Sequence, residues 1–120
     1  MEIKTVCDAV SESACGLSMG AVWQHISVEC AHIPDNDAFR VEVFFTLLER
    51  LMNEGEIRLA CNGEFLSGTH ARQLQQLKDA WPRENSEDEF DDLDDTGYWF
   101  LARSPAGIVW IMPDGREIWT

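Results

Sequence analysis

The residues best suited to chemistry are carboxylates, gathered in one stretch of the C-terminal half of the chain. Eight of the twelve residues from 84 to 95 are Asp or Glu, none is Lys or Arg, and two apolar residues interrupt the run. A calcium loop needs alternating oxygen ligands, a central Gly and a distal Glu, and this run lacks that order. Two interpretations stay open: a solvated loop, or a docking surface whose apolar pair anchors a partner while the charges steer it. The candidate partner-binding residues are Glu84, Glu87, Asp88, Glu89, Phe90, Asp91, Asp92, Leu93, Asp94 and Asp95.

The cysteines and histidines form no recognisable catalytic or metal-binding pattern. Cys30 and His32 are close in sequence and His25 precedes them, but zinc sites normally use two close pairs of ligands, and the second pair is missing. No catalytic signature surrounds any cysteine, and no glycine-rich nucleotide loop is present. We therefore expect no catalytic residue, no metal and no cofactor, and we predict that the protein is not an enzyme. A cysteine-dependent enzyme is kept only as a third hypothesis.

Four segments carry apolar residues at helical spacing, and all four precede the acidic run. The third segment has an apolar stripe so wide that we expect it to be buried on more than one side, at the centre of the core. The expected boundaries are Ile3 and Gly16 for the first helix, Ser18 and Pro34 for the second, Asn36 or Asp37 and Gly55 for the third, and Thr69 and Pro82 for the fourth.

The remaining segments predict strands. Asn62-Gly63 is a strong turn signal between strands at 57–60 and 64–66, and further strands are expected at 98–101, 108–112 and 117–119. The predicted fold class is α+β: N-terminal helices with a winged-helix-like hairpin, a fourth helix, and a C-terminal three-stranded antiparallel meander. We expect a single domain over 1–120, with an acidic loop at about 83–96.

The charge balance restricts the class of partner. The net charge is -13, from 22 acidic and 9 basic residues, which repels phosphate backbones and anionic membranes and favours a basic protein partner. A DNA-binding winged helix would bring basic side chains to phosphates, whereas Arg40 and Arg50 on the third helix are outnumbered by acids. No apolar run approaches the roughly 20 residues of a membrane span, and the first residues do not resemble a secretory signal. We expect a cytoplasmic protein that binds neither nucleic acid nor membrane.

Several stretches resemble one family of small bacterial proteins of unknown function. They are LERLMNEGEIRLA at 48–60, NGEFLSG at 62–68, YWF at 98–100, SPAGIVW at 104–110 and DGREIWT at 114–120. Members of that family occur near polymorphic toxin loci, including contact-dependent growth inhibition systems. The resemblance implies an immunity protein that neutralises a cognate basic toxin domain, with a nuclease as the expected toxin. A regulatory or adaptor module of winged-helix type, without direct DNA binding, is the alternative, and a homodimer stays open.

Overall fold

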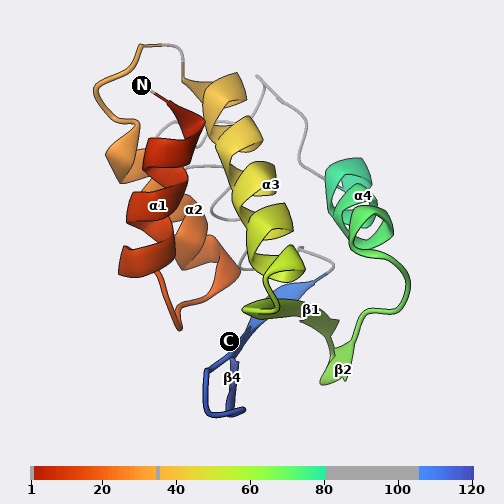
Figure 1. Cartoon of the computed structure of the whole chain (residues 1–120). Coiled ribbons are helices and arrows are strands. Elements are labelled where there is room, and N and C mark those ends of the chain that lie inside the picture. The colour runs from red at the N-terminus through yellow and green to blue at the C-terminus, as the bar shows by residue number, and fades with distance from the viewer. Residues whose placement is uncertain (1, 35, 81–105) are drawn as a thin grey trace.

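The computed structural model describes residues 2–34, 36–80 and 106–120 and shows helices joined to one sheet (Figure 1). The α+β class is confirmed. The predicted strand at 98–101 and the expected helix end at Pro82 lie outside the described residues. The elements are α1 (Ile3–Ser13), α2 (Met19–Glu29), α3 (Asp37–Asn53), β1 (Ile57–Cys61), β2 (Glu64–Phe65), α4 (His70–Ala80), β3 (Gly107–Ile111) and β4 (Glu117–Trp119).

Helix α3 is the centre of the core, as its wide apolar stripe predicts. Figure 1 shows it between α1 and α2 on one side and α4 on the other, and it also contacts β1. Val43, Phe44, Leu47 and Leu48 are completely buried, so apolar side chains leave this helix in several directions. Burying each such side chain stabilises the fold by about 1.5–3 kcal/mol, which makes α3 the largest contributor to the core among the helices.

Two helices begin at the residues that their capping chemistry predicts. The Ser18 hydroxyl accepts a hydrogen bond from the Ala21 amide at 3.2 Å, and the Thr69 hydroxyl accepts one from the Arg72 amide at 3.1 Å. Each bond satisfies a backbone donor that the first turn of a helix leaves unpaired. At the start of α3 the Asn36 amide group instead donates to the Cys30 carbonyl at 2.7 Å, so it ties α2 to α3 rather than capping.

The hairpin and the C-terminal strands form one antiparallel sheet in the order β2-β1-β3-β4. Asn62 and Gly63 both have positive φ, at 53° and 81°, which is the geometry of the tight two-residue turn that their sequence predicts. Strand β1 pairs with β3 on its other side, so the hairpin is not a free wing but half of the sheet. Strands β2 and β4 are the two edges of this sheet within the described part of the chain.

None of the helices in the described segments combines the length and the apolar character that crossing a membrane requires.

Candidate functional site

The acidic run that the sequence singles out, from Glu84 to Asp95, lies outside the described residues. The same holds for its two apolar members, Phe90 and Leu93. Its role as a partner-binding surface therefore stays a prediction, and the candidate site that the structure does describe is on the sheet.

The sheet has one face toward the helices and one face away from them. Ile57, Leu59, Ile108 and Trp110 belong to the buried core, so their face points toward the helices. The indole Nε1 of Trp110 donates to the Leu17 carbonyl at 2.7 Å, which attaches β3 to the α1–α2 connection. Because side chains alternate along a strand, the residues between these point to the outer face.

Three side chains from three strands meet on that outer face, and we call them the outer aromatic cluster: Arg58, Phe65 and Trp119. The ring centroids of Phe65 and Trp119 are 5.0 Å apart, with planes tilted by 34°. The Arg58 guanidinium carbon lies 3.6 Å from the centroid of the Phe65 ring, a close cation–π contact. The register explains how side chains of the two edge strands meet across the sheet. Ala60 and Gly107 lie in the same row as Phe65 and are small, so they leave room for its ring to contact Trp119.

The cluster covers apolar sheet surface and also exposes some of its own. Val109, directly opposite Trp119, is 1% exposed although its side chain points away from the helices. Trp119 itself is 46% exposed, while Arg58 is exposed and Phe65 half-buried. A partly buried Trp beside an Arg is typical of the residues that carry binding energy in protein interfaces.

A shallow pocket of about 290 Å³ adjoins the cluster. Small residues give it room, since Ala60, Gly63, Ala106 and Gly107 all line it, and Trp119 forms one of its walls. The pocket could hold one side chain of a partner. Among the described residues its lining is small, apolar or neutral, which suits the packing of a partner side chain.

A second recess of about 430 Å³ lies between α3 and α4. Val41 and Phe45 supply apolar surface, and the Lys78 ammonium lies 5.3 Å from the Phe45 ring centroid. Two carboxylates of α3, Glu42 and Glu49, also line it. The exposed side of the central helix is therefore acidic, which is opposite to what a DNA-reading helix needs.

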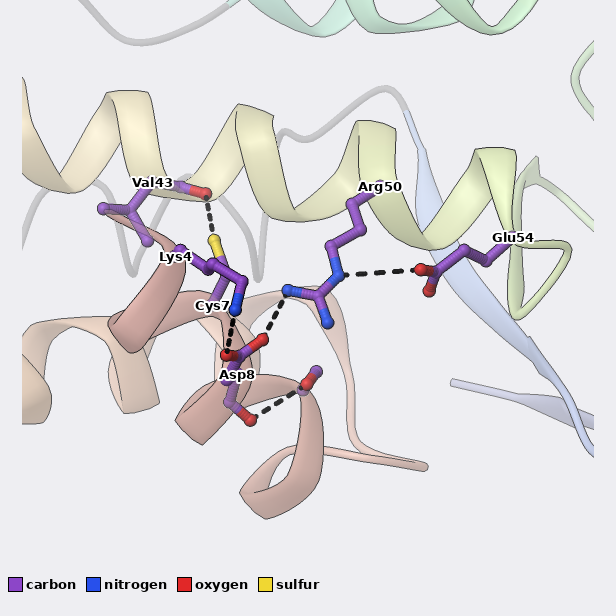
Figure 2. Close-up of polar contacts among 7 residues, drawn as sticks. Lys4, Cys7, Asp8, Val43, Arg50 and Glu54 are labelled. Atoms are coloured by element: carbon purple, nitrogen blue, oxygen red, sulfur yellow. Dashed lines mark hydrogen bonds and ion pairs between the residues drawn. The ribbon is translucent and has the colours of Figure 1, made fainter. Parts of the chain in front are cut away.

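The ionisable side chains of α1 and α3 form the most extended polar network described. Figure 2 shows Arg50 of α3 between Asp8 of α1 and Glu54: its Nη1 lies 2.6 Å from Asp8 Oδ1 and its Nε lies 3.7 Å from Glu54 Oε1. Lys4 Nζ adds a contact of 3.7 Å to the other carboxylate oxygen of Asp8. The hydrogen bond from Arg50 lowers the pKa of Asp8 and raises that of Arg50. This network joins two helices and serves as a structural link.

Two cysteines and two histidines of the described segments have defined surroundings. Cys7 and Cys30 are buried, and burial raises the pKa of both thiols, which disfavours the reactive thiolate. His25 Nδ1 pairs with the Ser13 hydroxyl at 2.9 Å, and His70 Nδ1 with the Asn53 side-chain oxygen at 3.0 Å. No group of three or more potential metal ligands occurs in the part of the chain that the structure describes.

Sequence reasoning located Trp119 but missed two of its neighbours. In the sequence, Trp119 is next to the C-terminus on a possible edge strand, which predicts partial exposure, and its 46% exposure confirms that. Arg58 and Phe65 carried no signal on their own, because their strands meet Trp119 only through the pairing of β1 with β3. Alternation within 57–61 places Arg58 on the outer face, and that was the one available clue.

The fold and the site together define a small α+β protein with an exposed aromatic cluster on an open sheet. A model of a family of proteins of unknown function, DUF596, matches residues 52–120, and the chain belongs to that family. The matched region includes all four described strands, and so the whole outer aromatic cluster.

One solved structure shares the architecture over nearly the whole chain. It is an uncharacterized protein conserved in bacteria, from Neisseria meningitidis, with 25% sequence identity and a TM-score of 0.78. The similarity covers 98% of this chain and 88% of the other. No curated protein sequence matches this chain.

Proposed function

We propose that this protein is a cytoplasmic immunity protein that binds a cognate toxin domain, expected to be a nuclease, and blocks its active site or its access to substrate. The observation that carries the proposal is the net charge of -13. A nuclease that binds a polyanion presents Lys and Arg around its active site, and an acidic protein is complementary to that surface. The resemblance to proteins encoded near toxin loci supports the same conclusion.

The arrangement of the elements favours a protein partner over a nucleic acid. A winged helix reads DNA with an exposed basic helix and a projecting hairpin. Here α3 is packed among α1, α2, α4 and β1, and its exposed side presents Glu42 and Glu49. The hairpin is held in the sheet by β3. The helix that would contact phosphates is therefore buried on several sides and acidic on its exposed side.

Binding alone accounts for neutralisation, and the protein needs no chemistry of its own. Carboxylates of the immunity protein would pair with basic side chains of the toxin and occupy the space of its substrate. Charge-assisted hydrogen bonds of this kind are about twice as strong as neutral ones. The acidic run from 84 to 95 and the exposed carboxylates of α3 are the proposed sources of these contacts.

The direct test is co-purification with the product of the gene immediately upstream. We expect a complex at micromolar concentration and protection of cells that express the toxin. Absence of both the complex and the protection would contradict the proposal. A toxin with an inactivated active site is used for purification, and the active toxin is used only in the protection assay.

The alternative function is a regulatory or adaptor module that binds proteins through the winged-helix-like unit. The order α2, α3, β1, β2 supports it, because the helices and hairpin of that unit are present. Genomic position distinguishes the two functions: a toxin gene upstream favours immunity, and a lone transcription unit favours the adaptor.

A further inference from the structure

The outer edge of β4 has backbone groups directed away from the sheet. The register pairs Val109 with Trp119 and Trp110 with Ile118, and the Met112 amide donates to the Arg116 carbonyl at 2.8 Å. Hydrogen-bonded and non-hydrogen-bonded pairs alternate along an antiparallel ladder. Met112 and Arg116 form a hydrogen-bonded pair, so Trp110 and Ile118 do as well, and the N–H and C=O groups of Ile118 point to β3. Glu117 and Trp119 belong to the non-hydrogen-bonded pairs, so their N–H and C=O groups point outward. No described strand pairs with that edge.

The side chains of β4 alternate between the two faces of the sheet. Ile118 is half-buried against the core, and its Cδ1 would lie 3.9 Å from a Cβ placed on Gly16, so it faces the helices. Glu117 and Trp119 therefore share the outer face. One offers a carboxylate and the other an exposed aromatic surface, two residues apart, which matches the spacing of side chains on one face of a partner strand.

Strand β4 and the turn before it carry two acids, Asp114 and Glu117, and one base, Arg116. Arg116 is the nearest base along the chain, and its Nε lies 2.7 Å from Asp114 Oδ2, so its charge is already balanced. Among the described residues Glu117 makes no ion pair. A second copy of the chain is disfavoured at this edge, because each copy carries a charge of -13. An extended basic segment fits the same edge in both backbone and charge.

We propose that the open edge of β4 accepts an extended basic segment of the toxin domain as an added strand, with a basic side chain against Glu117 and an apolar or aromatic side chain against Trp119. Strand addition of this kind takes its affinity from main-chain hydrogen bonds and its specificity from alternate side chains. The inference rests on the proposed function and adds the surface by which the toxin is held. Open edges are otherwise hazards for aggregation, and the exposed Glu117 moderates that hazard in the free protein.

The first experiment measures amide hydrogen exchange of Glu117, Ile118 and Trp119 in the free protein and in the complex with the product of the upstream gene. In the free protein the Ile118 amide should exchange slowly and its two neighbours fast. In the complex both neighbours should become protected by at least about tenfold. Slow exchange of Glu117 and Trp119 in the free protein would overturn the proposal, because the edge would already be occupied by this chain or by a second copy.

The second experiment separates the backbone from the side chain with two variants of one residue. Glu117→Ala removes the carboxylate and keeps the outward amide, whereas Glu117→Pro removes the amide as well. Proline is tolerated at an edge position whose N–H faces solvent, so the sheet should persist, which thermal unfolding checks. We expect Glu117→Pro to bind the toxin domain about fivefold more weakly than Glu117→Ala, the effect of one lost hydrogen bond.

The outcomes distinguish this inference from the proposed function. A complex that forms with unchanged exchange at Glu117 and Trp119, and with equal affinity of the two variants, overturns the strand addition and leaves the immunity function intact. A complex that does not form at all overturns the immunity function, and the strand addition with it. Protection of both amides, together with weaker binding of Glu117→Pro, supports the inference.

Discussion

At the scale of single residues, Trp119 is the largest of the exposed apolar side chains on the described surface. Its indole is held against Phe65 at a centroid distance of 5.0 Å, yet it is 46% exposed. Holding a large side chain in place before binding reduces the entropy that is lost when a partner docks. An exposed Trp prepared in this way contributes more to affinity than a mobile one.

The first prediction concerns that indole. Trp119→Ala should weaken binding of the toxin domain about 30-fold, because truncation of a central Trp typically costs about 2 kcal/mol or more. Val28→Ala on α2 is the control, since Val28 is also an exposed apolar residue but lies away from the sheet. Calorimetry measures both variants, and equal affinities would show that the outer face is not part of the interface.

The second prediction concerns pH and the link between α1 and α3. The hydrogen bond from Arg50 lowers the folded-state pKa of Asp8, so the contact stabilises the fold above the unfolded-state pKa of about 3.9 and is lost as pH falls through the folded value. Asp8→Asn should therefore lower the urea midpoint slightly at pH 7, and the difference from the unmodified protein should shrink as pH falls below about 4 and disappear below the lowered folded-state pKa. Glu12→Gln, on the same helix, is the matched control. A difference that persists in acid would mean that Asp8 acts by packing.

At the scale of elements, α3 carries more of the buried core than any other described helix. Leu48 is completely buried on it, and Leu48→Ala should lower the free energy of unfolding by about 2–5 kcal/mol. Thr46→Ala, on the exposed side of the same helix, should change it by no more than about 0.5 kcal/mol. Urea denaturation measures both. Similar losses in the two variants would contradict the central position of α3.

The elements were predictable wherever the signal is local. Helical spacing and capping residues located four helices, and Asn62-Gly63 located the turn of the hairpin. The pairing of β1 with β3 was not predictable, because it joins residues about fifty positions apart and alternation within a strand does not identify its neighbour. The same holds for the outer aromatic cluster. The partial exposure of Trp119 was predictable from its own position, whereas its proximity to Arg58 and Phe65 depends on the pairing of β1 with β3.

At the scale of the whole molecule, the excess of acids is both large and uneven. Eight of the 22 acids lie between 84 and 95, so partner steering should depend on that run more than on the total charge. Opposite potentials raise association rates by about 10 to 1,000-fold at low salt, and the effect decreases as salt screens the charges.

The fourth prediction concerns a variant in which the acids from Glu87 to Asp95 are replaced by neutral residues. Association should slow by about tenfold or more, and its salt dependence should become flatter. The control neutralises an equal number of exposed acids outside the run and outside α3: Glu2, Glu12, Glu29, Glu54, Glu56, Glu64 and Asp79. Stopped-flow mixing at several salt concentrations measures both. Identical rates for the two variants would show that the run is only a solubilising segment.

The central claim is that this protein inhibits a toxin by binding it. The most direct measurement titrates the purified protein into an activity assay of the toxin domain encoded immediately upstream. We predict that activity falls linearly and is abolished at a fixed stoichiometric ratio, as expected for tight binding that occludes an active site. Full activity in the presence of a large molar excess of the protein would contradict the account.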